Sequence, residues 1–256
     1  MWKTAFFLCI VFSLHMSPVV ESAVVSQHFD NEGSLVSERK KSPYMPSPGT
    51  FRYSIPEGIE LHKDITYEYY PVFGKTFSEI VTSVEENGPF NREKNRRSTS
   101  KFEWGVGWSY QFEFTYVIDE ETKLVDVALE ISDINIRYDI TITLPTLIDD
   151  TSLNPIEKSL WKAYFQRLLE HEHDHAKIIQ DAEAKNTVLA SIKGLNYLTF
   201  DFRTDINIEK TIGLFLREET AKLGQEWVRR LKDRLGDYDR VTDYGNKHDL
   251  RQSFFK

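Results

Sequence analysis

The chain has almost no cysteine and no long apolar run. Its one cysteine, Cys9, lies in a short apolar stretch near the N-terminus, so no disulfide framework is possible. Basic residues are in the minority, since 40 acidic and 32 basic residues give a formal net charge of −8. Nucleic acids and anionic membranes both attract clustered Lys and Arg. We therefore expect neither a nucleic acid nor a membrane as a partner.

The N-terminal residues have the pattern of a secretory signal peptide. A short positive start is followed by an apolar run and then by small residues, whereas a membrane anchor would need about 20 apolar residues. We predict that residues 1–23 are a signal peptide and that the protein is secreted and extracellular. Residues 24–56 are rich in Ser, Pro, Glu and Lys, which predicts a poorly ordered arm. The pair Lys40 and Lys41 leaves open that part of this arm is a removable pro-segment.

Alternating apolar residues predict long strands in the next part of the chain. Every second position over 102–118 is aromatic or aliphatic, which is typical of a strand with one buried face. A charged turn over 119–123 leads to a second alternating segment, 125–144, whose phase changes near 132–133. Such a phase change predicts a bulge. With a β-rich segment over 65–73, these strands predict an antiparallel β-meander.

Two long helices are predicted after the strands. The first begins at Asn154, where a following proline and Glu157 are typical of an N-cap and a capping box. Its apolar stripe, at three- and four-residue steps, comprises Leu160, Tyr164, Leu168, His171, His175, Ile178 and Ala182. The second helix covers 208–235 and ends at Gly236. Strands followed by helices imply a single α+β domain over residues 57–256.

The segment His171 to His175 contains the pattern His-Glu-x-x-His on the first of these helices. Four residues turn a helix by about 400°, so the imidazoles of His171 and His175 lie only about 40° apart and can reach one metal ion. Glu172 is offset by about 100°, where it need not bind the metal but can take a proton from an attacking water. This arrangement is typical of zinc hydrolases. It predicts Zn²⁺ as the cofactor and Glu172 as the catalytic base.

Two buried histidines that hydrogen bond to the backbone or to an acid are the alternative to a metal site. We favour the metal site because the pair lies on the apolar stripe, where an imidazole without a partner is unfavourable. His173 points to the opposite side and is expected to be solvated. A purely structural zinc site is disfavoured, because the mature chain has no cysteine to complete four ligands.

A catalytic zinc ion needs a third protein ligand, and the sequence offers several candidates. Asp181 lies six residues beyond His175, but the chain would have to turn there, and we expect the helix to continue. Glu219 interrupts the apolar stripe of the second helix, so it is expected to face the core as a ligand or in an internal salt bridge. The remaining candidates lie in the tail over 238–248.

Several short motifs occur along the chain in a recognisable order. They comprise Tyr70 to Gly74, Trp104, Trp108, Trp161, His171 to His175, and Tyr238, Asp239, Thr242 and Gly245. In these motifs the chain resembles a mostly bacterial family of secreted zinc-dependent proteases, the domain of unknown function family 922. The resemblance implies a zincin-like fold, a peptide or protein substrate, and a metal ligand just before the terminal glycine. That position is His in the family pattern and Tyr244 in this chain.

Tyr244 is therefore the predicted third ligand beside His171 and His175, since a metal lowers the pKa of a hydroxyl group. The phenol could instead donate to the oxyanion, and His248 could substitute as ligand. We predict a secreted zinc-dependent peptidase that hydrolyses peptide bonds. The alternative is a secreted binding or effector protein that keeps the zincin scaffold and the metal but lacks turnover. The sequence leaves the substrate, the cleavage preference and the oligomeric state open.

Overall fold

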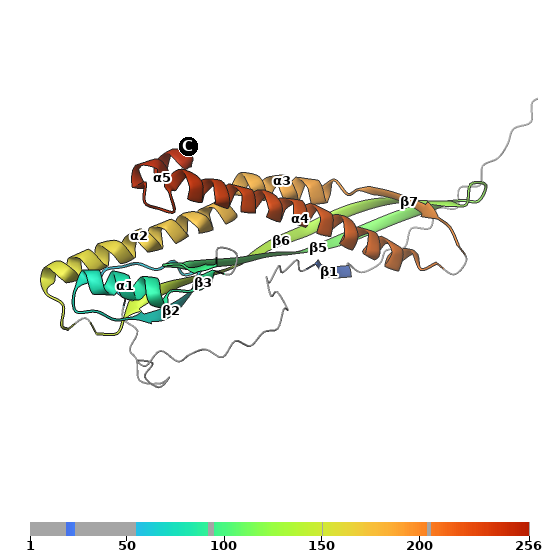
Figure 1. Cartoon of the computed structure of the whole chain (residues 1–256). Helices are drawn as coiled ribbons and strands as arrows, with labels where there is room; N and C mark the ends of the chain where they lie inside the picture. The colour runs from blue at the N-terminus through green and yellow to red at the C-terminus, as the bar shows by residue number, and fades with distance from the viewer. Residues whose placement is uncertain (1–18, 24–54, 92–94, 150, 204–205, 256) are drawn as a thin grey trace, which may run out of the picture. The chain divides into compact units, whose positions relative to one another are not determined.

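The computed structural model describes residues 19–23, 55–91, 95–149, 151–203 and 206–255 (Figure 1). Most of the predicted signal peptide and of the predicted N-terminal arm lies outside these residues. The described chain has the predicted α+β composition of strands and helices. No helix in this part of the chain is both long and apolar enough to cross a membrane.

The chain forms two compact units, and each is assembled from separate segments. Among the described residues, unit 1 comprises 19–23, 106–138 and 180–233, and unit 2 comprises 55–105, 139–179 and 234–255, with the gaps stated above. Two strands and one helix run through both units, so a single element contributes to two different environments.

Long strands dominate unit 1. Strand β5 (Lys101–Asp119) and strand β6 (Leu124–Leu147) are neighbours in the sheet and are joined by a tight turn (Figure 1). Strand β1 (Val19–Ala23) pairs antiparallel with β5, and strand β7 (Tyr197–Asp201) pairs antiparallel with the start of β6. The long strand predicted over 102–118 is therefore confirmed.

The predicted bulge occurs in β6. Ser132 and Asp133 are consecutive exposed residues, and Asp133 has a φ of 48°. Before them the odd-numbered residues are buried, and beyond them the even-numbered residues are the less exposed ones. Asp tolerates this left-handed backbone conformation better than most residues. At this bulge the inward-facing residues change from the odd-numbered to the even-numbered positions.

The core of unit 1 is mainly apolar, with Thr220 as a buried polar residue. Helices α3 (Ala182–Lys193) and α4 (Ile208–Thr242) contribute to it with the inward residues of the strands. The buried cluster comprises Trp108, Tyr110, Phe112, Val125, Val127, Leu129, Ile131, Ile192, Leu198, Ile212 and Leu216. Aromatic side chains of this size bury large apolar areas. The aromatic stripe predicted from the sequence therefore forms part of this core.

The sheet of unit 2 is mixed rather than a simple antiparallel meander. Strand β2 (Thr66–Val72) pairs in parallel with residues 141–147 of β6. Parallel neighbours need a crossover, and the chain between them includes helix α1 (Phe77–Asn87) and the small hairpin of β3 (Phe90–Asn91) and β4 (Arg96–Arg97). Sequence alternation predicts the strands but does not specify this pairing.

Helix α2 (Pro155–Ile179) begins at the predicted cap. The Asn154 side chain accepts hydrogen bonds from two first-turn amides, at 2.9 and 3.0 Å. Glu157 does not complete a capping box, because its carboxylate accepts instead from the amide of Phe77 in α1, at 2.6 Å. The buried face of the first turns also differs from the prediction: it comprises Trp161, Phe165 and Leu169, while Leu160 is 45% exposed.

The first helix does not continue through 182, so that expectation is wrong. It ends at Ile179, and Asp181 caps a new helix, α3, by accepting from the amide of Ala184 at 2.9 Å. Asp favours such caps over helix interiors, because its side chain competes for backbone amides. The carboxylate of Asp181 therefore serves as the N-cap of α3.

The second helix is longer than predicted. It continues through Gly236 to Thr242 and is followed by α5 (His248–Phe254). A glycine inside a helix costs only about 1 kcal/mol, and the buried residues Tyr238 and Thr242 extend the packed face beyond it. This extension brings Tyr238 and Asp239 into unit 2 on regular helix.

Candidate metal centre

The two predicted imidazoles lie together in unit 2. His171 and His175 occupy consecutive turns of α2, their ring centroids are 4.5 Å apart, and each residue is 8% exposed. With Glu172 they form a buried group whose possible ligand atoms lie within 4.8 Å of one another. The predicted proximity of the two imidazoles is thus confirmed.

Asp239 completes the cluster from α4. Its Oδ1 atom lies 2.8 Å from Nε2 of His175 and 3.3 Å from Nε2 of His171. Both imidazoles therefore direct the same nitrogen toward one carboxylate oxygen. Ligand atoms at about 2.0–2.2 Å from a tetrahedral zinc ion lie about 3.3 Å apart. The donor types suit a zinc ion, and the 3.3 Å separation of His171 from Asp239 matches this spacing. The 2.8 Å separation of His175 from Asp239 is that of a hydrogen bond and would lengthen around an ion.

Glu172 lies on the other side of His175. The carboxylate is almost fully buried, and its Oε2 atom is 3.2 Å from Nδ1 of His175. Its Oε1 atom accepts a hydrogen bond from the hydroxyl of Ser100, just before β5. When a metal displaces the proton from Nε2, a carboxylate beside Nδ1 keeps the remaining proton there. No sequence pattern identified Ser100 as part of this site.

Opposite charges outweigh burial in the cluster. Burial favours neutral His175, but its contacts with Asp239 and Glu172 raise its pKa to about 9. Burial likewise raises the pKa of Asp239, but hydrogen bonds with His171 and His175 lower it well below its usual range. The pKa of Glu172 is also lowered, because His175, His171 and Ser100 together outweigh its burial. Both carboxylates are therefore held in their ionised form.

A glycine turn packs against the other imidazole. The Nδ1 atom of His171 is buried and has no hydrogen-bond partner among the described residues. A Cβ atom on Gly245 would lie 3.0 Å from this nitrogen, and Gly245 has a φ of 85°. A side chain at this position would be both crowded and strained. The glycine therefore allows the chain after α4 to cover His171 closely.

The structure describes the side chains of two other ligand candidates, Tyr244 and Glu219. Tyr244 is 52% exposed, with its ring centroid 5.9 Å from the Arg96 guanidinium carbon. His248 begins α5, and its side chain is not among those described. Glu219 belongs to unit 1 and pairs with Lys222 at 2.6 Å, so the expectation that it faces the core is wrong. The cluster thus contains Asp239 where the sequence favoured Tyr244.

His173, between the two imidazoles in sequence, is more enclosed than expected. Its Nε2 atom lies 2.7 Å from the hydroxyl of Tyr67 in β2, and the side chain is half-buried. Burial lowers its pKa. His173 therefore ties α2 to β2 and is not a freely solvated residue.

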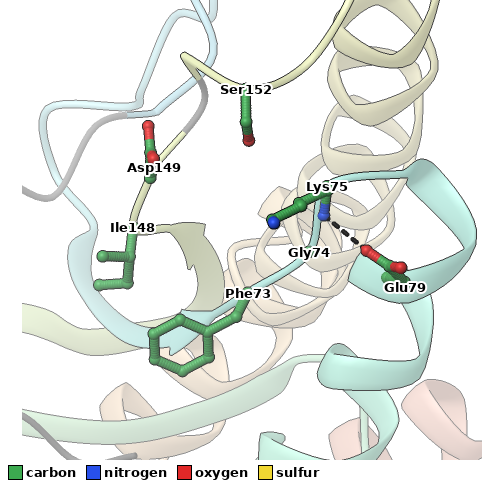
Figure 2. A pocket seen from close by; sticks show the side chains of 7 residues that line it. All are labelled: Phe73, Gly74, Lys75, Glu79, Ile148, Asp149 and Ser152. Carbon is green, nitrogen blue, oxygen red and sulfur yellow. Dashed lines mark hydrogen bonds between the residues drawn. The ribbon is translucent and has the colours of Figure 1, made fainter.

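A cavity of about 770 Å³ lies at another place in unit 2, where the parallel strands β2 and β6 end (Figure 2). Its lining residues are Phe73, Gly74, Lys75, Glu79, Ile148, Asp149 and Ser152. The start of α1 borders this cavity, but Glu79 already accepts from the amide of Lys75 at 2.7 Å (Figure 2). None of the lining residues belongs to the histidine cluster, so this cavity is separate from the candidate metal centre.

Comparison with known proteins gives one match. No curated protein and no solved structure matches the chain. The family model DUF922, described as a bacterial protein of unknown function, matches residues 67–246. This range includes β2, the histidines of α2 and the end of α4 through Gly245. The chain therefore belongs to DUF922.

Proposed function

We propose that this protein is a zinc-dependent peptidase whose metal ligands are His171, His175 and Asp239. The observation that supports this most strongly is the approach of two imidazole Nε2 atoms to one carboxylate oxygen, at 2.8 and 3.3 Å. Nitrogen and oxygen ligands of this kind suit Zn²⁺. Three protein ligands leave a fourth position for water or substrate, as catalytic zinc sites require.

Glu172 is the residue we assign to proton transfer. When bound, the metal would polarise the scissile carbonyl and lower the pKa of the attacking water. Ser100 holds one oxygen of Glu172, and the lowered pKa keeps the carboxylate ionised and able to accept a proton. The second oxygen lies beside Nδ1 of His175. In this role it would turn toward the water on the Nε2 side, take the proton from that water and deliver it to the leaving amine. Ser100 then acts by positioning this base.

A peptide substrate and an extracellular location complete the proposal. The substrate class is supported by the His-Glu-x-x-His pattern on α2, which is typical of metalloproteases. The location is supported by the signal-peptide pattern of residues 1–23. A binding protein on the same scaffold is the second candidate, because both oxygens of Glu172 already have partners in the cluster.

Metal content and turnover, measured on the same variants, test the proposal. Purified wild-type protein should bind about one zinc ion per chain, and Asp239→Ala and His171→Ala should lose it. Glu172→Gln should retain zinc, because the amide oxygen can still accept from Nδ1 of His175. Its rate of peptide cleavage should fall about 10²–10⁴-fold if Glu172 is the general base.

Glu219→Gln is the matched control, because it makes the same change at an acid that lies in unit 1 and pairs with Lys222. It should alter neither zinc content nor cleavage. Folded wild-type protein that takes up no zinc would contradict the metal site. Cleavage by Glu172→Gln at the wild-type rate would refute the role of Glu172, and zinc binding without any cleavage would favour the binding protein.

A further inference from the structure

Asp174 is as deeply buried as the imidazoles, yet the proposed chemistry does not use it. It is 2% exposed, and its Oδ2 atom accepts from the Tyr238 hydroxyl at 2.7 Å and from Arg251 Nε at 2.6 Å. Its Oδ1 atom accepts from Lys177 Nζ at 3.0 Å. Burial raises the pKa of Asp174, but these hydrogen bonds lower it overall. A buried carboxylate is tolerated when it is paired in this way.

Tyr238 connects this carboxylate to the candidate metal centre. The residue is fully buried, and its ring stacks on His171 with centroids 5.3 Å apart and an interplanar angle of 27°. The same ring meets His175 edge-on, at 5.4 Å and 77°. The next residue in α4 is Asp239, which contacts both imidazoles. Tyr238 and Asp239 therefore both contact the two imidazoles, one through its ring and the other through its carboxylate.

Arg251 links α5 to the same part of α2. Its side chain is only 13% exposed. Besides Asp174, it donates to two groups of Glu170: the carboxylate at 2.5 Å and the backbone carbonyl at 3.1 Å. Glu170 and Asp174 are one helical turn apart, so the planar guanidinium joins two acids on one face of α2. Phe254, also in α5, packs edge-on against Tyr238 at 5.2 Å.

We infer that Arg251, Asp174 and Tyr238 form a brace that positions Asp239 against His171 and His175. The end of α4 needs such support, because Gly236 lies two residues before Tyr238 and an interior glycine weakens a helix by about 1 kcal/mol. Partners behind metal ligands hold those ligands in the geometry that binds the metal. Here the contact with the ligands is made by the Tyr238 ring, and the Tyr238 hydroxyl is held by Asp174. The three residues are positioning residues. The effect on zinc affinity that we expect from them rests on the proposed zinc site.

Zinc affinity, measured by competition with a chelator, tests the brace. Arg251→Met and Tyr238→Phe should each weaken zinc binding about 10–100-fold, as is typical when a residue supporting a metal ligand is lost. Tyr238→Phe keeps the ring and removes only the hydroxyl, and it decides the question if Arg251→Met does not fold. Arg251→Lys should recover part of the affinity, because it keeps the charge but loses the planar fork.

Arg240→Met is the matched control, because Arg240 lies beside Asp239 in α4 but its side chain is 77% exposed and pairs with Asp237. Exposed pairs contribute little, so zinc affinity should stay at the wild-type value.

Hydrogen exchange in zinc-free protein separates this inference from the proposed function. The amides of residues 239–242 should exchange faster in Tyr238→Phe than in wild type, because the end of α4 is released from α2. Unchanged exchange would overturn the brace even if wild-type protein binds no zinc. Wild-type zinc affinity in both Tyr238→Phe and Arg251→Met would also overturn it, while the metal site itself would stand.

Discussion

Units 1 and 2 share β5, β6 and α4, yet they bury different kinds of side chain. The core cluster of unit 1 is wholly hydrophobic. Among the described residues, the buried histidines and carboxylates all belong to unit 2: they are His171, Glu172, Asp174 and His175. Burial of charge is unfavourable unless partners compensate for it. The buried charged residues therefore indicate that unit 2, rather than unit 1, contains the functional site.

Helix α4 belongs to both units, and its two parts contact different kinds of side chain. Its residues up to 233 belong to unit 1, where Ile212 and Leu216 fill the apolar cluster. Its residues from 234 onward belong to unit 2, where Tyr238 and Asp239 contact the imidazoles. We therefore expect substitutions in the first part to change stability alone, and substitutions in the second part to change metal binding.

Leu216→Ala should have the largest effect on stability. Leu216 is fully buried in unit 1, and truncation of a buried leucine costs about 2–5 kcal/mol. Zinc affinity of the folded fraction should not change. Urea unfolding and chelator competition on the same preparation would measure both quantities. Leu214→Ala, at a residue 49% exposed in the same helix, should stay within about 0.5 kcal/mol of wild type. A parallel loss of zinc affinity in Leu216→Ala would break the contrast between the units.

Two glycines offer a matched pair, one in each unit. A Cβ atom on Gly224 would lie 1.9 Å from the Trp108 ring, so Gly224→Ala should destabilise by about 1–3 kcal/mol without changing zinc affinity. Gly245→Ala adds a Cβ atom 3.0 Å from the His171 ring at a φ of 85°. It should cost about 1–3 kcal/mol and also weaken zinc binding. Equal zinc affinity in the two variants would contradict the assignment of Gly245 to the site.

The parts of the site that are local in sequence could be predicted from the sequence. His171 and His175 are one helical turn apart, so their proximity follows from helix geometry alone. Asp239 lies 64 residues from His175, and its approach depends on α4 continuing through Gly236. Glycine is common at helix ends, and sequence reasoning therefore ended the helix there.

In the fold, too, only features that are local in sequence could be predicted. The alternation of β5 and the bulge near Asp133 are local properties and were predicted correctly. The parallel pairing of β2 with β6 and the hydrogen bond from Ser100 to Glu172 join segments distant in sequence. Neither leaves a periodic signal, because each depends on tertiary packing rather than on a local preference. Thus the sequence predicts most strands and helices but neither the ends of α2 and α4 nor the long-range partners.

The stability of zinc-free protein should depend on pH through His175 in unit 2. The folded pKa of His175 is raised to about 9 from an ordinary value of 6.5. Its stabilising contribution should therefore be complete below pH 6.5 and disappear as the pH rises through 9. We expect a loss on the order of 1–3 kcal/mol over this range. Urea unfolding at pH 6 and pH 9 would measure it, and Asp239→Asn should reduce the difference. The same slope in Asp239→Asn would mean that other groups cause it.

Tyr244→Phe should have the smallest effect, although the sequence favoured Tyr244 as the third ligand. The residue is 52% exposed, and a phenylalanine ring can keep the contact with Arg96. Surface substitutions of this kind change stability by about 0.5 kcal/mol or less. Zinc affinity should stay at the wild-type value, because Asp239 already lies 2.8 Å from Nε2 of His175. Loss of zinc in Tyr244→Phe, together with its retention in Asp239→Ala, would instead make the phenol the ligand. The end of α4 would then have to rearrange when the metal binds.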